Sequence, residues 1–105
     1  MAKAFNLEVK REILPLPALD KSAKDQLRRA AMSIMLNIAE GTSRFSRADK
    51  RNFYVIARGS TFECVAILEL LEAENILTDG VRVKFYQKAE QISKMLFAMI
   101  RILEK

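Results

Sequence analysis

The sequence contains no histidine and a single cysteine, Cys64. Without histidine, Ser-His and Cys-His nucleophile pairs and histidine-based acid–base catalysis are excluded. A lone cysteine cannot form a disulfide within the chain, and a zinc site would lack its usual ligands. We therefore expect no metal and no cofactor. Carboxylates, lysines and tyrosines are the only candidates left for catalysis. We expect Cys64 to be a small buried hydrophobic residue.

Long apolar runs are also missing, although half of the residues are hydrophobic. No run approaches the ~20 residues that a membrane span needs. The N-terminal stretch MAKAFNLEVKREIL lacks the continuous apolar segment of a secretion signal. We therefore expect a cytoplasmic protein with no membrane contact.

Glycine and proline are scarce, with three glycines and two prolines among 105 residues. A chain of this length is typical of one domain, so we expect a single domain over residues 1–105. The few helix breakers divide the chain into helices. Two capping boxes mark where helices begin: "SAKD", with Ser22 as N-cap, and "SRAD", with Ser46 as N-cap. The expected helices run from Ala4 to Leu14, from Asp20 or Ser22 to Thr42, from Ser46 to Glu74, and from the turn 75–80 to Leu103.

No convincing alternating strand pattern is present. The helix after the last turn carries one clear apolar seam from Phe85 to Leu103, with steps of four and three residues. Three long helices and a short first one, joined by tight turns, predict an all-α, antiparallel up-down four-helix bundle.

The third expected helix has two apolar sides. One arc, which includes Ile56, Ala57 and Cys64, predicts the side that faces the core. A second stripe lies nearly opposite and would face water in a monomer, so we predict a homo-oligomer, with crowded packing inside one bundle as the alternative. The interface candidates are Val55, Gly59, Phe62, Ala66 and Leu70.

The formal net charge is +5, and the segment from Lys24 to Arg58 carries all of it, with eight basic and three acidic residues (8 − 3 = +5). Such a segment favours an anionic partner such as nucleic acid, although a solvated or intersubunit charged face would explain it as well. Arginines contact phosphates and an aromatic ring can stack on a base. The nucleic-acid-binding candidates are Arg44, Arg47, Lys50, Arg51, Tyr54 and Arg58.

A narrow polar stripe separates the apolar faces of the second helix. Buried polar groups need partners, so we predict a structural polar network, within which Glu40 and Arg44 have the favourable spacing of four residues. Its expected members are Arg29, Ser33, Asn37, Glu40 and Glu63, with Arg58 close by. The alternative is catalysis by Glu40 and Glu63 as acid and base. No phosphate loop, metal motif or nucleophile elbow accompanies them, so we expect no enzyme.

The segment QLRRAAMSIMLNIAEGTSRFSRADKRNFYVIARGSTFE, residues 26–63, resembles the signature of the bacterial four-helix bundle proteins encoded by intervening sequences in 23S ribosomal RNA genes. The matching elements are "LRRA", "S…NIAEG", "R.S" and "F…IA.GS..E". Two features depart from that pattern. Met35 stands where the family often has proline, which implies a straighter second helix, and the first helix is shorter than usual.

The resemblance implies a four-helix bundle that assembles as a ring, with a pentamer as the implied number, and no established enzyme activity. A structurally similar group, the accessory proteins of diversity-generating retroelements, binds nucleic acid and assists a reverse transcriptase. The implied partners are therefore further copies of the chain, RNA or DNA, and a reverse transcriptase or another protein.

Two functions remain open at this point. In the first, the oligomer binds nucleic acid with little sequence selectivity. In the second, it is a protein-interaction scaffold whose arginines pair with Glu63, Glu69 and Glu72 of neighbouring subunits. Exposed arginines on one rim favour the first function, and arginines buried in ion pairs favour the second. A solvent-filled cleft that holds Glu40 and Glu63 would favour an enzyme.

Overall fold

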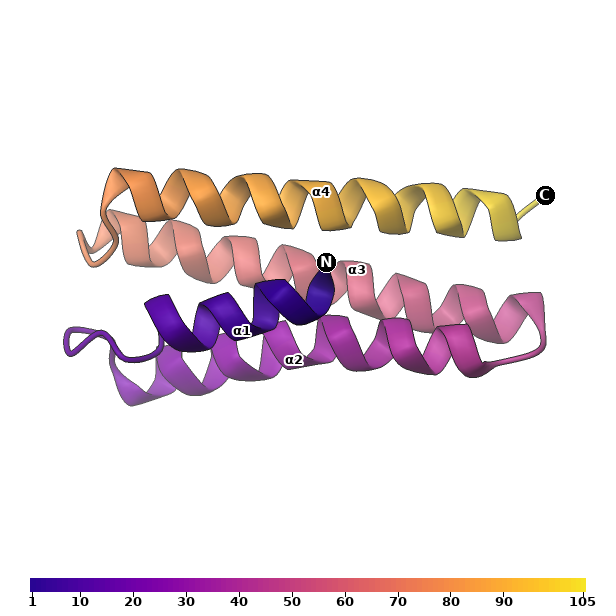
Figure 1. Ribbon diagram of the computed structural model, residues 1–105, viewed down its shortest axis with the longest axis horizontal. Coiled ribbons are helices and arrows are strands. Elements are labelled where there is room, and N and C mark those ends of the chain that lie inside the picture. Colours follow the sequence, from indigo (N-terminus) through magenta and orange to yellow (C-terminus); the bar gives the residue numbers. More distant parts are fainter.

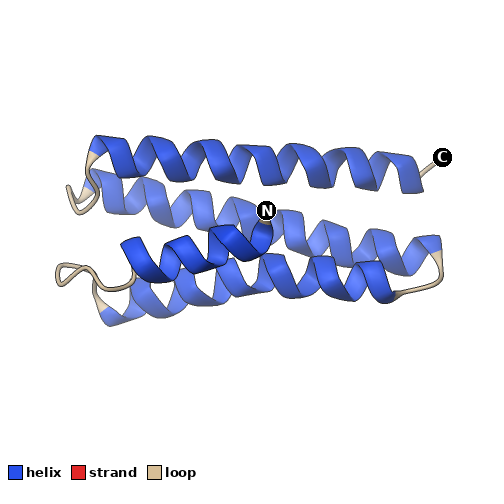
Figure 2. Cartoon of the chain, in the orientation of Figure 1, coloured by secondary structure: helices blue, strands red, loops and turns tan.

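The computed structural model describes residues 1–105 and contains four helices and no strand. The long helices alternate in direction along one axis, and the short first helix runs beside the second (Figure 1). All connecting loops lie at the two ends of the bundle (Figure 2). This confirms the predicted all-α fold with a short first helix. The helices are α1 (Ala2–Glu12), α2 (Lys21–Ser43), α3 (Arg47–Ala73) and α4 (Asp79–Leu103).

The starts of the three long helices are fixed by side-chain caps. The Ser46 hydroxyl accepts a hydrogen bond of 3.0 Å from the N–H of Asp49, as predicted. The prediction of Ser22 as a cap is wrong, because Asp20 caps α2 by accepting a bond of 2.7 Å from the N–H of Ala23. An ionised carboxylate at the positive end of the helix is a strong cap.

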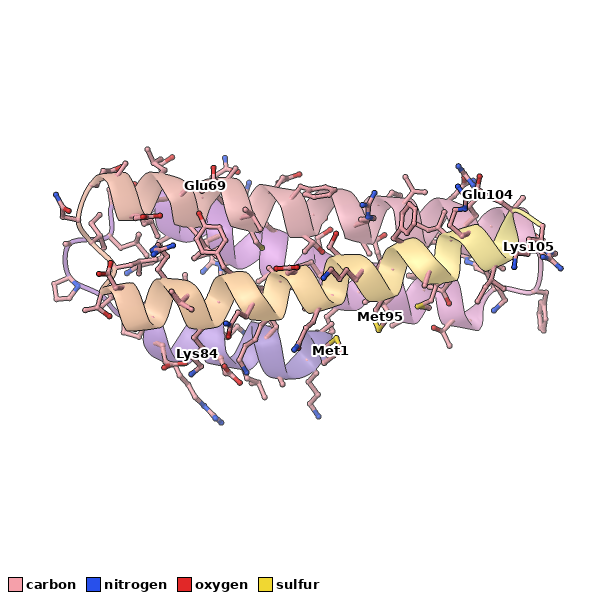
Figure 3. All side chains as sticks on the ribbon, turned by 90° about the horizontal axis from the view of Figure 1, so that it is seen from above. Met1, Glu69, Lys84, Met95, Glu104 and Lys105 are labelled. Carbon is pink, nitrogen blue, oxygen red and sulfur yellow. The ribbon has the colours of Figure 1, made fainter.

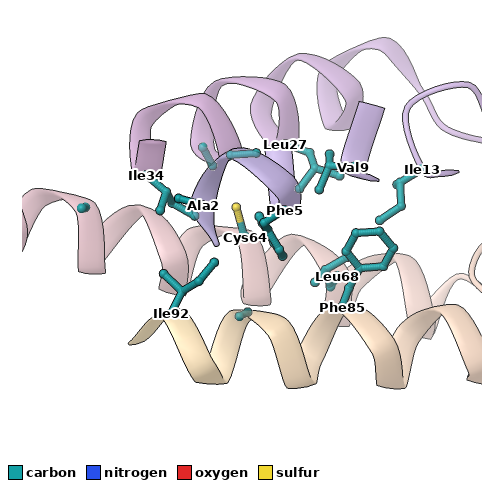
Figure 4. Close-up of a cluster of buried hydrophobic side chains, with 14 of the residues drawn as sticks. Ala2, Phe5, Val9, Ile13, Leu27, Ile34, Cys64, Leu68, Phe85 and Ile92 are labelled. Atoms are coloured by element: carbon teal, nitrogen blue, oxygen red, sulfur yellow. The ribbon is translucent and has the colours of Figure 1, made fainter. Parts of the chain in front are cut away.

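The core is formed by side chains from all four helices (Figure 4). Phe5 of α1 and Phe85 of α4 are fully buried and meet edge to face, with ring centroids 5.9 Å apart. Each buried side chain of this size contributes about 1.5–3 kcal/mol relative to an exposed one. Leu27 of α2 and Leu68 of α3 are fully buried in the same cluster, so the short α1 covers the core in its half of the bundle.

Three ion pairs attach α1 to α4. Lys84 lies 2.6 Å from Glu12 and 3.4 Å from Glu8, and Lys88 lies 2.9 Å from Glu8. The hydrogen bond from Lys88, followed by that from Lys84, holds the pKa of Glu8 below its ordinary value of 4.5. These pairs stabilise the docking of α1, which has only about three turns and buries one side of them.

Only half of the bundle has four helices. Met1, at the start of α1, lies near the middle of the long axis of the bundle (Figure 1 and Figure 3). Beyond this point the bundle consists of α2, α3 and α4 alone. None of the four helices combines the length and the apolar composition that crossing a bilayer requires.

The predicted core arc of α3 is correct at its centre and wrong at one edge. Ala57, Thr61 and Cys64 are fully buried, but Ile56 is 50% exposed. At 100° per residue, Ile56 lies about 100° around the helix axis from the buried Ala57. This places it at the outer edge of α3, on the side where α2 packs. Its side chain therefore contributes to the outer surface rather than to the core.

Candidate functional site

A chain of hydrogen bonds joins α2 to α3 near the middle of the bundle. The Nδ2 of Asn37 donates to the carbonyl oxygen and to the hydroxyl of Ser33, at 2.8 and 3.0 Å. The hydroxyl of Ser60 donates to the carbonyl of Ile56 at 3.1 Å and lies 2.7 Å from that of Ser33. Because the proton of Ser60 is used there, Ser33 must donate to Ser60. These residues therefore fix the register of the two helices.

The other residues of the expected polar network do not join this chain of bonds. The predicted pair of Glu40 and Arg44 is present at 3.0 Å, but it lies on the surface and apart from these bonds. Arg29 and Glu63 are exposed and form no ion pair within the chain.

The two glutamates of the enzyme hypothesis lie far apart. The contact between Ser33 and Ser60 places Glu63 level with the residues near position 30 of α2. At 1.5 Å per residue, Glu40 is roughly 15 Å further along the axis. Neither carboxylate lines any cavity of the chain. The geometry therefore offers no shared acid–base site.

Two of the basic candidates bind the ends of neighbouring helices. Arg47 donates from Nη2 to the carbonyl of Ile102 at 2.8 Å, at the C-terminal end of α4. The Nζ of Lys50 donates to the carbonyls of Gly41 and Thr42, at 3.3 and 3.1 Å, at the end of α2. These carbonyls lie in the last turn of their helices, where the regular helical hydrogen bonds end, and they carry the negative end of the helix dipole. Both cations therefore stabilise the fold at this end.

Arg44 and Arg51 are held more loosely. Besides its pair with Glu40, the guanidinium of Arg44 lies 4.9 Å from the ring centroid of Phe53. Arg51 is 3.9 Å from Glu104. Their side chains are 46% and 43% exposed. A guanidinium has five N–H donors, and a single ion pair uses only one or two, so both residues have donors that face water.

Tyr54 does not belong to the exposed surface. It is 5% exposed, and its hydroxyl lies 3.2 Å from that of Thr42. Its ring occupies the space that a side chain at Gly41 would need. The prediction that Tyr54 can stack on a base is therefore wrong. The exposed aromatic residue here is Phe45, between α2 and α3, which stood out in the sequence only as a phenylalanine inside a polar turn.

The charge of the chain gathers at one end of the bundle. We call residues 40–58 and 98–105 the basic end; they contain seven basic and three acidic side chains (7 − 3 = +4). The opposite end, residues 8–28 and 69–90, contains eight basic and nine acidic side chains (8 − 9 = −1). Figure 3 shows Lys105 at the basic end. Arg101 and Lys105 join it only through the packing of α4, which the sequence segment alone did not reveal.

The second apolar stripe of α3 faces outward, as predicted. Val55, Phe62 and Leu70 are between 42% and 53% exposed. A Cβ atom added at Gly59 would meet nothing within 4 Å, so the fold of the single chain does not require this glycine.

A groove runs between α3 and α4 beside this stripe. One cavity of about 390 Å³ and another of about 320 Å³ share Arg58 and Phe62 in their walls. We call this the α3–α4 groove. The guanidinium of Arg58 lies 4.9 Å from the ring centroid of Phe62 and 5.1 Å from that of Phe97. The Nε of Arg58 is buried and has no hydrogen-bond partner.

The comparisons with known proteins agree with this fold. A family model described as 23S rRNA-intervening sequence protein matches residues 1–98. The chain is similar to a crystal structure of a protein of unknown function from the S23 ribosomal protein family of Bacteroides thetaiotaomicron. The two are 25% identical, with a TM-score of 0.89 over 95% of this chain and 91% of the other. No curated protein matches.

Proposed function

The chain belongs to the family of 23S rRNA-intervening sequence proteins, and from this premise we propose that it is a non-catalytic homo-oligomer that binds nucleic acid through its basic end. The observation that carries the proposal is the exposed positive rim at this end. Its net side-chain charge is +4, and the ion pairs of Arg44 and Arg51 there leave both side chains more than 40% exposed. Outward guanidinium donors suit phosphate oxygens, which accept such bonds regardless of base sequence.

Little sequence selectivity is expected from this surface. Base recognition requires side chains that reach the edges of bases from an element inside a groove. The basic end consists instead of helix ends and the turn between α2 and α3, where the ring of Phe45 is fully exposed. That ring can stack on an unpaired base of either RNA or DNA. The affinity should therefore come from phosphates and fall steeply with salt.

The proposed assembly into an oligomer fits this role in nucleic-acid binding. The outward stripe of α3 would otherwise remain in water, and contiguous apolar patches of several hundred Å² mark interaction sites. We propose a closed ring, with five copies as the number to test. A ring aligns the basic ends of its subunits, so its field on an anionic polymer exceeds that of one chain.

A scaffold that binds only protein is the second candidate. Arg47 and Lys50 favour it, because their donors are engaged by the ends of α4 and α2. In this case the positive charge serves the fold, and the exposed apolar surface serves partner binding.

A binding titration separates the two candidates. Labelled single-stranded RNA and duplex DNA are titrated with the protein at several salt concentrations. The test variant changes Arg44, Arg51 and Arg101 to glutamine, which leaves the helix-end contacts of Arg47 and Lys50 in place. The control changes three exposed cations at the opposite end to glutamine and so removes the same charge. These control positions are Lys10, Arg11 and Lys21.

The nucleic-acid proposal predicts binding that weakens steeply with salt and is lost in the test variant only. Three fewer phosphate contacts should reduce the slope of log K against log salt by about 2–3. Equal loss in the control would mean that total charge, not the basic end, determines binding. No binding by the wild-type protein at low salt would leave the scaffold as the better account.

A further inference from the structure

Arg58 lacks an acidic partner within its own chain. Its guanidinium lies between Phe62 and Phe97, and its Nε is buried without a hydrogen bond. The carboxylate that lines the same cavity, Glu104, is instead within 3.9 Å of Arg51. A cation that is partly removed from water without a partner is destabilising. The groove is therefore a site that is incomplete in the single chain.

Glu63 presents the complementary feature on the other side of α3. It is exposed, forms no ion pair, and is accompanied by the half-exposed side chains of Ile56 and Leu70 on α3 and of Leu36 on α2. We call these four residues the α2–α3 flank. An acid with exposed apolar side chains along the same flank is the chemistry that a groove with one unpaired cation and two phenylalanine rings can bind.

The two surfaces cannot meet within one molecule. Arg58 and Glu63 are five residues apart, which places them about 140° apart around the axis of α3. Their separation along the axis is only about 7 Å. A second copy lying alongside the first can therefore bring its flank to the groove with little displacement along the axis.

Gly59 marks the point where the two copies would come closest. It lies in the wall of the groove, and space around it is open. A glycine inside a helix destabilises that helix by about 1 kcal/mol relative to alanine. A closely packed neighbour would explain why the position has no side chain.

We propose that the α3–α4 groove receives the α2–α3 flank of a neighbouring copy, in which Glu63 pairs with Arg58. The inference rests on the self-association proposed above and specifies its contact. Because groove and flank are different surfaces, each copy uses one surface toward each of two neighbours. Such a head-to-tail contact can close into a ring, whereas a two-fold dimer uses the same surface on both copies.

Charge exchange tests the pairing. The molar mass in solution is measured by light scattering for the wild type, for Arg58→Glu, for Glu63→Arg and for the double variant. Each single variant places like charges together and should weaken assembly at least tenfold, and the double variant should restore it. The control is Arg101→Glu, because Arg101 is exposed and lies 5.9 Å from the Phe97 ring but does not line the groove. This control should keep the wild-type mass.

The outcomes separate two claims: that the chain forms an oligomer, and that Arg58 and Glu63 meet between its copies. A monomeric wild type would overturn both. An oligomeric wild type with undiminished assembly of Arg58→Glu would overturn the pairing alone. Circular dichroism shows whether the single variants fold. If they do not, the pairing is tested with Arg58→Lys, whose amine can be joined to a nearby carboxylate by a carbodiimide. A link between position 58 of one copy and Glu63 of another supports the proposal, and links only within one copy overturn it.

Discussion

The hydroxyl oxygens of Ser33 and Ser60 lie 2.7 Å apart and join α2 to α3. Both serines belong to the signature segment, and Asn37 extends the same chain of hydrogen bonds. We predict that Ser33→Ala and Ser60→Ala each destabilise the fold by about 1 kcal/mol, because each leaves a polar partner unsatisfied. Urea unfolding of both single variants and the double variant measures this. The double variant should lose less than the sum, and strict additivity would contradict the contact.

The glycines at positions 41 and 59 should respond in opposite ways to alanine. A Cβ at Gly41 would lie 2.5 Å from Cε1 of Tyr54, whose ring is buried, so the ring or the backbone must shift to admit it. We predict that Gly41→Ala destabilises the fold by about 1–3 kcal/mol. Thermal and urea unfolding measure the change. An unchanged midpoint would contradict the tight contact between Gly41 and Tyr54.

Gly59→Ala should instead stabilise the isolated chain by about 1 kcal/mol, because the added methyl group meets no atom and alanine favours helix. The measurement is made in the Arg58→Glu background, which we expect to be monomeric, so that assembly does not contribute to the unfolding midpoint. Destabilisation in this background would show that the single chain itself needs the glycine.

The docking of α1 should depend on pH through Glu8 and Lys84. Since the pKa of Glu8 is lowered by folding, its contribution to stability is complete above its ordinary pKa of 4.5. It is then lost as the pH falls through the lower value of the folded state. The pKa of Lys84 is raised, chiefly by its hydrogen bond to Glu12, so its contribution is lost as the pH rises beyond 10.5.

The loss of the Glu8 contribution at low pH is tested by urea unfolding of the wild type and of Glu8→Gln, with midpoints measured between pH 7 and pH 2.5. We expect the wild type to be more stable at pH 7 and the two curves to converge at the lowest pH. A constant difference at every pH would mean that the carboxylate charge of Glu8 does not stabilise α1.

Cys64 should be unreactive in the folded protein. It is fully buried, among core side chains (Figure 4), and burial, with a smaller effect of Glu63, raises the pKa of its thiol to about 12. The thiolate is the reactive form, so a thiol reagent at pH 8 should modify it only after unfolding. Modification at the rate of a free thiol without denaturant would contradict this placement.

The periodicity of apolar residues was sufficient to predict the four helices, because burial of one face dominates their stability. The position of Tyr54 could not be obtained in this way. Its ring is buried because Gly41, on another helix, leaves room for it, and a pattern within one helix does not contain this information. In the same way, the acceptors of Arg47 and Lys50 are the ends of other helices, which only the packed bundle brings near.

Sedimentation velocity of the protein mixed with a labelled single-stranded RNA tests the central claim most directly, because it follows assembly and binding together. At low salt, the label should sediment with a species whose protein mass is a multiple of 12.0 kDa. With the variant lacking Arg44, Arg51 and Arg101, the label should sediment freely while the protein keeps its mass. A wild-type protein that sediments at 12.0 kDa, or an oligomer that leaves the label free at low salt, would contradict the account.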